Sequence, residues 1–436
     1  MKFRISSILV FLNLIFFINL YAQKNEQNNL SLNEAINLTL NNHPLLEQAL
    51  DQADAAEAKI NQQKSFYYPR VEGDLTYVRI GPVPSIEFNG HSFELAPANN
   101  YNANISASQL VYDFGKRSTI LELVKSYKLS ALDKIDLIKN NLIYQTIQTY
   151  YTILFLEKSL DVNNEQILTL QQHIELTGKK VESGSATDFD ILTTQVRVAD
   201  AQNQKTDIEN ALHKQIIALN GLFGRPSESP VNLTDELKID SSAFDLESLI
   251  NKAYTDRPEM KLAQDAEKNA EISKKVARLN DRPNLSMMAS LGVKNGYQPD
   301  LNDPTVNWTA GVHASIPIFN GNLKKAKVAE AEANMKSSAE EINVLKRKIK
   351  LEVEQAAADA EANRSKIKTT EIQVEHALQA VSRAGSQYRD GVITNLDLID
   401  TETSLAQARL MYFRVVYQNI LSRYNLKKAV GDFIAE

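Results

Sequence analysis

Two aspartates, Asp397 and Asp400, are the residues whose type and spacing best suggest a chemical role. They stand three positions apart in the segment TNLDLID, so on a helix they share one face. A ring of such carboxylates suits cation selectivity, whereas the competing interpretation is capping, because an acid in a first turn offsets the helix dipole. Capping fully explains Asp190 after Thr187 and could explain Asp397 after Thr394. Asp400 lies beyond the positions where capping helps most, so we favour a pore role for it.

No catalytic chemistry is visible elsewhere in the sequence. The six histidines have no metal-ligand spacing, and the chain has no cysteine, no P-loop, no G-x-S-x-G and no G-x-G-x-x-G. The lack of cysteine excludes disulfides, thiol nucleophiles and Cys-ligated metals. A net charge of −6 argues against a nucleic-acid partner. We therefore predict that the protein is not an enzyme and uses no cofactor and no metal.

The N-terminal segment 1–22 has the pattern of a secretory signal peptide. Lys2 and Arg4 precede an apolar stretch that ends near Leu20, and Ala22 comes before a polar start. The alternative, a membrane anchor, is disfavoured because the stretch is short for a span. Export across the inner membrane is the prediction.

Glycine and proline are scarce, with 15 and 12 in 436 residues, and their positions mark a tandem duplication. LNEAINLTLNNHP at 32–44 matches LESLINKAYTDRP at 246–258, while Gly184 and Gly391 lie in matching segments 207 residues apart. The predicted parts after the signal peptide are a first repeat over 23–224, a linker over 225–243 and a second repeat over 244–436.

Each repeat is predicted to hold the same elements in the same order. A first helix begins at a capping box on Ser31 with Glu34, or at an N-cap on Asp245, and can run to about Phe66 or Leu279. A long helix follows the strands, because long stretches there lack both glycine and proline, and a second helix returns after a glycine turn. The predicted bounds are 116–183 and 187–222 in the first repeat, and 322–388 and 394–431 in the second.

Two segments in each repeat, within about 70–113 and 283–319, alternate apolar and polar residues with the period of a strand. An open four-stranded sheet cannot sit alone in lipid, because each unsatisfied backbone group at its edges costs several kcal/mol. Several chains would therefore share one barrel. The alternative is a small sheet packed on the protein's own helices.

The duplicated order of helix, strand pair, long helix, glycine turn and returning helix resembles the TolC family of outer-membrane efflux and secretion channels. The repeat openings, the strand ends LVYDFG and IPIFNG, and the turn segment YRDGVITNLDLID carry the resemblance. It implies a mainly α fold with a β-barrel portion. In that architecture three chains form a twelve-stranded barrel in the outer membrane, continued by a trimeric α-barrel through the periplasm.

The resemblance also assigns roles near the glycine turns. It places Asp397 and Asp400 at the constricted periplasmic entrance, and it makes Tyr388 part of a lock that holds neighbouring coiled coils together. The family's basic partner in that lock is Ile393 here, so Arg389 is a conjectural substitute. The resemblance further implies adaptor docking at the helix turns, which we assign to Gly184, Thr187, Gly391 and Thr394. Simple packing of Tyr388 and ordinary helix termination by the glycines are the competing interpretations.

The predicted function is a passive exit duct in the cell outer membrane, extending into the periplasm. The implied partners are two further copies of the chain, a periplasmic adaptor, an inner-membrane pump of the RND, ABC or MFS type, and outer-membrane lipid. An alternative is a periplasmic adaptor or coiled-coil scaffold. The duplicated strand pairs distinguish the two, because an adaptor would carry one hairpin between glycine-rich modules.

Overall fold

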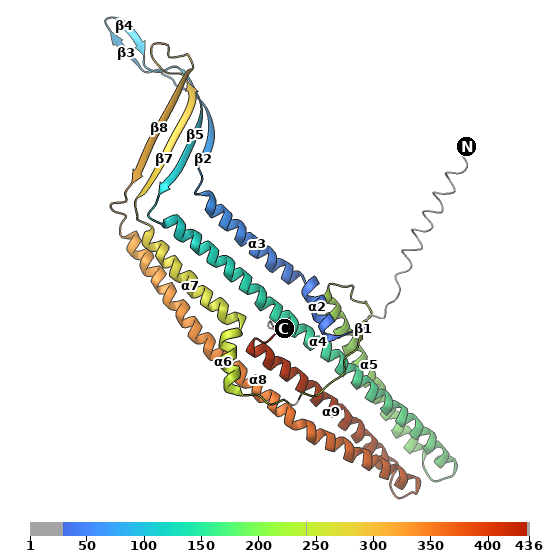
Figure 1. The fold of residues 1–436 in the computed structure, drawn as a ribbon. Coiled ribbons are helices and arrows are strands. Elements are labelled where there is room, and N and C mark those ends of the chain that lie inside the picture. Colours follow the sequence, from blue (N-terminus) through green and yellow to red (C-terminus); the bar gives the residue numbers. More distant parts are fainter. Residues whose placement is uncertain (1–28, 241, 434–436) are drawn as a thin grey trace, which may run out of the picture. The chain divides into compact units, whose positions relative to one another are not determined.

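The computed structural model describes residues 29–240 and 242–433 (Figure 1). The predicted signal peptide lies outside these residues. Eight helices of these ranges form two matched sets of four, and each helix has as many residues as its counterpart. The first set is α2 (Leu32–Asn42), α3 (Pro44–Ser65), α4 (Lys116–Glu182) and α5 (Asp188–Phe223), and the second is α6 (Leu246–Asp256), α7 (Pro258–Leu279), α8 (Leu323–Arg389) and α9 (Asn395–Val430).

The opening helix of each repeat is two helices, where the sequence predicted one. The break lies at His43 before Pro44 and at Arg257 before Pro258, and both residues have extended backbone, with ψ of 124° and 129°. The ring of a proline disfavours the helical conformation of the residue before it. The prediction of a single helix through either position was therefore wrong. The predicted starts are confirmed, because Ser31 and Glu34 form a capping box and Asp245 accepts from the backbone N–H of Ser248.

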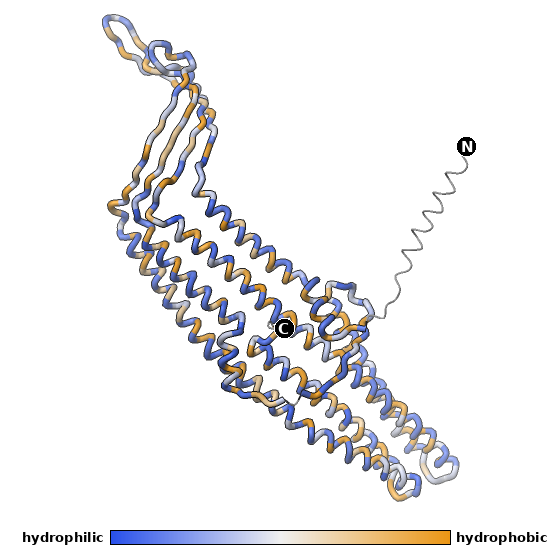
Figure 2. Tube along the Cα trace, viewed as in Figure 1, coloured by the Kyte–Doolittle hydropathy of each residue, from blue (hydrophilic) through white to orange (hydrophobic). Residues whose placement is uncertain are grey.

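Apolar and polar residues interleave along every long helix in Figure 2. This is the pattern of helices that pack side by side, each with one apolar stripe. Among the helices of the described residues, none combines the length and the apolar character that a membrane crossing requires.

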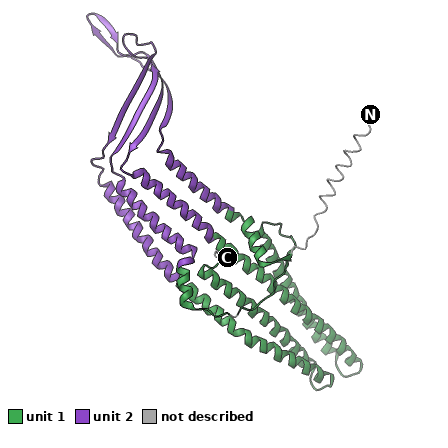
Figure 3. Ribbon diagram, in the orientation of Figure 1, with its two compact units in different colours: residues 1–46, 138–254, 349–436 green, residues 47–137, 255–348 purple. Residues whose placement is uncertain are grey.

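The chain divides into two compact units, and neither coincides with a repeat (Figure 3). Unit 1 holds the described residues within 1–46, 138–254 and 349–436, and unit 2 holds residues 47–137 and 255–348. Each unit therefore takes matched segments from both repeats, which is how a duplicated chain builds two pseudo-equivalent halves into one core.

Unit 2 contains a four-stranded antiparallel sheet in the order β2–β5–β7–β8. Its strands are β2 (Arg70–Arg79), β5 (Asn99–Tyr112), β7 (Asn284–Lys294) and β8 (Thr305–Ser315). The last strand ends before Pro317, short of its predicted end, because proline has no N–H to donate to a ladder. The two outer strands, β2 and β8, each have one edge without a partner strand in this sheet.

The sheet has one apolar and one polar face, as the alternating pattern predicted. Leu291 pairs with Trp308 and with Ile105, while Ser290 pairs with Thr309 on the other face, where their hydroxyls are 2.8 Å apart. The apolar face is exposed, with Leu75, Leu291 and Trp308 all open to the surroundings. The alternative of a sheet packed on its own helices is therefore wrong.

Four short strands of the described residues were not predicted. The segment between β2 and β5 contains a two-stranded hairpin, β3 (Ser85–Phe88) with β4 (His91–Glu94). In unit 1, β1 (Asn29–Leu30) pairs in parallel with β6 (Asn232–Leu233), which ties the inter-repeat linker to the start of the first repeat. The hydroxyl of Tyr150, buried on α4, donates to the carbonyl of Leu30 at 2.8 Å and fixes the same junction.

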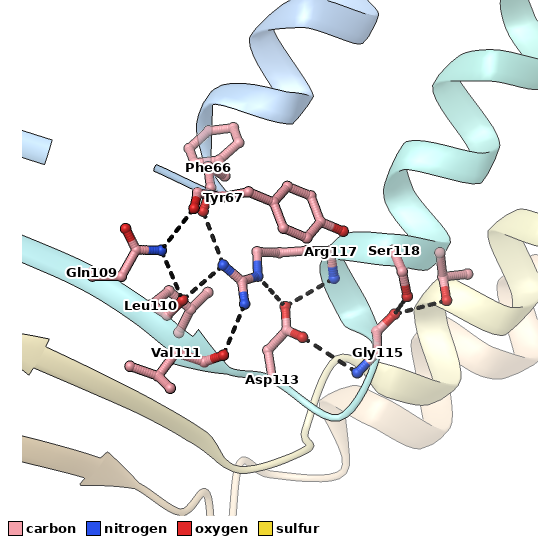
Figure 4. Close-up of polar contacts among 10 residues, drawn as sticks. Phe66, Tyr67, Gln109, Leu110, Val111, Asp113, Gly115, Arg117 and Ser118 are labelled. Carbon is pink, nitrogen blue, oxygen red and sulfur yellow. Dashed lines mark hydrogen bonds and ion pairs between the residues drawn. The ribbon is translucent and has the colours of Figure 1, made fainter. Parts of the chain in front are cut away.

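An ion pair secures the passage from β5 into α4 (Figure 4). Asp113 accepts from the backbone N–H of Arg117 at 2.8 Å, and its carboxylate pairs with the Arg117 guanidinium at 3.1 Å. The guanidinium also donates to the carbonyls of Phe66, Leu110 and Val111. One buried side chain thus joins the end of α3, the end of β5 and the first turn of α4, and satisfies three carbonyls that strand and helix leave open.

Candidate functional site

The candidate site lies in unit 1, at the two turns that join α4 to α5 and α8 to α9. Gly184 and Gly391 have φ of +75° and +73°, a conformation that glycine adopts without strain. In both turns the glycine N–H bonds three residues back and the next N–H bonds five residues back, as in a Schellman motif. The two turns are therefore built alike, and each helix reverses at the predicted glycine.

The first turn of each returning helix carries a capping box. Thr394 donates to the Asp397 carboxylate from its backbone N–H at 2.9 Å and from its hydroxyl at 2.7 Å. These two hydrogen bonds lower the pKa of Asp397, so the carboxylate stays charged at neutral pH. Thr187 and Asp190 repeat the arrangement with the same two distances. Capping thus accounts for one oxygen of Asp397, and the exposed side chain leaves its charge open to the solvent.

Asp400 has a different environment, although it shares a helix face with Asp397. Its carboxylate lies 3.4 Å from the guanidinium of Arg197 on α5, and both side chains are about half exposed. Asp400 is therefore not a cap, and part of its charge is balanced by Arg197 of the first hairpin, which is α4 with α5, in the same chain. Sequence reasoning missed Arg197, because no local pattern links residues so far apart.

Tyr388 is buried against the first hairpin of its own chain. Its hydroxyl lies 3.2 Å from that of Thr177, and the ammonium of Lys180 sits 4.0 Å from its ring centre and donates to its backbone carbonyl. Within the chain, the cation in contact with Tyr388 is therefore Lys180, and not Arg389. Arg389 instead donates to Ser386 on its own helix at 3.3 Å.

Ile393, where the resemblance implied a basic residue, takes a packing role. It lies against the cluster of Ala384, Tyr388 and Leu398. A cation at this position would enter an apolar contact, at a cost in desolvation.

His173 and Asn395 continue the contact between the two hairpins into the interior. The Nε2–H of His173 donates to the Asn395 side-chain carbonyl, and the Asn395 amide donates to the carbonyl of Asp190 at 3.1 Å. Burial lowers the pKa of His173, and the nearby Lys180 lowers it further. A neutral histidine therefore helps to hold α4, α5 and α9 together.

Glu402 is a half-buried acid on α9, near the contact between the two hairpins. Its carboxylate borders a cavity of about 100 Å³ between α4 and α9, and one of its oxygens is buried without a hydrogen-bond partner among the described residues. Burial raises the pKa of Glu402 to about 7. The ion pair of Glu165 with Arg409 lines the same cavity. No group of three or more His, Asp or Glu side chains in the described ranges is placed to hold a metal ion.

The fold and the site together define a class of protein, a protomer that pairs an amphipathic strand sheet with two long helical hairpins. A family model described as "Outer membrane efflux protein" matches residues 35–225 and 249–432. The chain belongs to this family. Membership places it in the outer membrane among transport channels, and the prediction of a TolC-like chain is confirmed.

Several individual proteins are similar to this chain over most of its length. The alkaline protease secretion protein AprF of Pseudomonas aeruginosa is 22% identical over 92% of this chain and 84% of its own length. The outer membrane protein TolC of Escherichia coli is 23% identical over 92% and 83%. The crystal structure of the outer membrane protein VceC of Vibrio cholerae shares the fold, with a TM-score of 0.75 at 18% identity over 92% and 96%. The family is one of outer-membrane efflux proteins, and AprF is named for secretion, so the adaptor alternative is wrong.

Proposed function

We propose that the protein is a passive exit duct in the outer membrane, made of three copies of this chain. The observation that carries the proposal is the sheet of unit 2, whose apolar face is exposed and whose outer strands β2 and β8 each keep an open edge. Neighbouring copies could pair these edges and close a barrel whose apolar face meets lipid. A sheet with these properties has no stable place in water.

We further propose that the helix turns form the periplasmic entrance and the adaptor contact. Asp397 and Asp400 would contribute six carboxylates in three chains, while Gly184, Thr187, Gly391 and Thr394 would lie where the adaptor docks. Cargo would arrive from an inner-membrane pump of the RND, ABC or MFS type, which supplies the energy. The exposed aromatic residues at the strand–helix junction, such as Tyr68 and Phe319, support contact with lipid headgroups there.

Single-channel recording of the purified protein in a planar lipid bilayer tests the proposal. We expect discrete conductance steps from a homotrimer that resists dissociation, and a preference for cations. Recovery of the mature protein as a monomer that forms no pore would overturn it. Cross-linking in cell envelopes from cysteines placed at the two turns then tests adaptor docking.

A further inference from the structure

The two helical hairpins of unit 1 are counterparts at an offset of 207 residues, and their contact within one chain is visible. The first hairpin is α4 with α5, and the second is α8 with α9. Ile399 of the second hairpin is only 1% exposed, because it packs in a cluster with Leu170 and Ala201 of the first. Thr403, one turn further along α9, lines the cavity between the hairpins.

The counterparts of these residues on the first hairpin lack such cover. Leu192 corresponds to Ile399 and is 59% exposed, and Val196 corresponds to Thr403 and is 61% exposed. Phe189, at 71%, differs from them, because its counterpart Leu396 is 54% exposed as well. Leu192 and Val196 are therefore exposed although their counterparts lie at the contact between the hairpins. Phe189 is exposed and so is its counterpart.

We propose that Leu192 and Val196 pack against the second hairpin of a neighbouring copy of this chain. The receiving surface would be Val374 and Ala377, the half-buried counterparts of Ile167 and Leu170. In a closed ring of duplicated chains, the contact between the hairpins of one chain recurs between the second hairpin of one copy and the first hairpin of the next. The inference rests on the proposed function, because it requires that ring.

The same correspondence indicates that the two kinds of contact differ in chemistry. Within a chain, two ion pairs and one lysine–tyrosine contact join the hairpins: Glu165 with Arg409, Arg197 with Asp400, and Lys180 with Tyr388. The corresponding residues between copies carry no charge: Ile372 with Gln202, Ser404 with Thr193, and Gln387 with Val181. The contact between copies is thus apolar and uncharged at these positions.

This difference favours a second copy over an adaptor as the occupant. An adaptor that approached the turns would cover Phe189 along with Leu192, whereas a copy that repeats the internal contact covers Leu192 and leaves Phe189 open. The difference in chemistry also indicates where the entrance can open. The hairpins of one chain would stay together through their polar contacts, and separation would occur between copies.

Cysteine pairs test the proposal directly, because the natural chain contains none. In Leu192→Cys with Ala377→Cys, oxidation or a short bis-maleimide should produce disulfide-linked or cross-linked dimers and trimers on a denaturing gel. The matched pair Leu170→Cys with Ile399→Cys should link within one chain and run as a monomer. Phe189→Cys with Ala377→Cys should give no linked product.

A single substitution gives a second measurement that does not depend on cross-linking geometry. In the detergent-solubilised oligomer without an adaptor, Leu192→Cys should react with a maleimide at least tenfold more slowly than Phe189→Cys. Equal reaction rates together with no cross-link, in an oligomer that still conducts, would overturn the proposal and leave the proposed function intact. A protein that neither assembles nor conducts would overturn both.

Discussion

Asp397 and Asp400 lie on one helix face, but different groups surround their charges. Thr394 holds the Asp397 carboxylate in a capping box, whereas Asp400 shares its charge with Arg197 across the two hairpins. The field that a cation meets at this face therefore depends on an arginine as well as on two aspartates. An exposed pair of this kind is worth up to about 1 kcal/mol, which is enough to tune an electrostatic binding site without locking it.

We predict that Arg197→Gln and Asp400→Asn change cation block in opposite directions. Asp400→Asn should weaken block of the channel by a trivalent cation, because it removes one carboxylate per chain. Arg197→Gln should strengthen it by up to about fivefold, the equivalent of about 1 kcal/mol, because Asp400 is then unbalanced. Single-channel titration measures both effects, with Asp161→Asn on α4 as the charge-matched control. Identical block in all three variants would exclude an entrance role for Asp400.

Glu402 makes the stability of the contact between the hairpins depend on pH. Its pKa of about 7 is well above the ordinary value of 4.5, so the folded chain holds a proton here that the unfolded chain has released. The contribution of this residue to stability is therefore full below about pH 4.5 and is lost as the pH rises through 7.

We predict that Glu402→Gln raises the melting temperature at pH 8 and leaves it nearly unchanged at pH 4. The glutamine keeps the shape and carries no charge at either pH, so it removes a cost that only the ionised carboxylate imposes. Allowing for the partial solvent access of the side chain, we expect about 1 kcal/mol at pH 8. Thermal melts of the solubilised protein at both pH values measure this, and Gln195→Glu, at the corresponding position of α5, is the control for added charge. A shift of equal size at both pH values would contradict the burial argument.

At the scale of elements, the junction between β5 and α4 depends on one arginine. Arg117 is nearly buried, with 12% of its side chain exposed, and it bonds Asp113 and three carbonyls at once. Its counterpart in the second repeat is Lys324, and Asp113 corresponds to Asn320. The two junctions of the duplicated chain are therefore secured by different means.

We predict that Arg117→Met destabilises the strand–helix junction by about 3 kcal/mol, because it leaves a buried carboxylate and open carbonyls behind. Lys324→Met at the matching position of the other repeat should have little effect, since within the described part of the chain no such network surrounds it. The measurement is the temperature at which the oligomer dissociates, together with cleavage by a protease near residue 113. Equal losses in both variants would show that the network adds nothing to the junction.

The elements themselves could be predicted well, and the contacts between them could not. Gly184, Gly391 and the capping residues Ser31 and Thr394 act locally, so sequence alone located the helix reversals and starts. The contact of Lys180 with Tyr388 depends on how two helices lie against each other, and no periodicity reports that. The breaks at Pro44 and Pro258 were readable from the sequence in principle, because the effect of proline on its predecessor is local.

At the scale of the whole molecule, the duplicated chain leaves two kinds of surface incomplete. Its sheet leaves one edge of β2 and one edge of β8 without a partner strand. Its first hairpin exposes Leu192 and Val196, whose counterparts on the second hairpin lie against the first. Both unfinished surfaces have matching surfaces elsewhere on the same chain, namely the open edge of β8 for that of β2 and the second hairpin for the first. The proposed closed assembly of identical copies would complete all of them together.

If that assembly is a barrel in lipid, adjacent residues of β8 must respond oppositely to charge. We predict that Trp308→Lys, on the apolar face, costs about 2 to 4 kcal/mol per chain and prevents stable insertion, because it places a cation in the hydrocarbon. Thr309→Lys, on the polar face, should insert and form pores with altered ion selectivity. Outer-membrane fractionation measures insertion, a heat-modifiability gel measures stable folding, and single-channel recording measures ion selectivity. If both lysines were tolerated, or both were excluded, the faces of the sheet would not divide lipid from lumen, and the strands would need another surrounding than the one proposed.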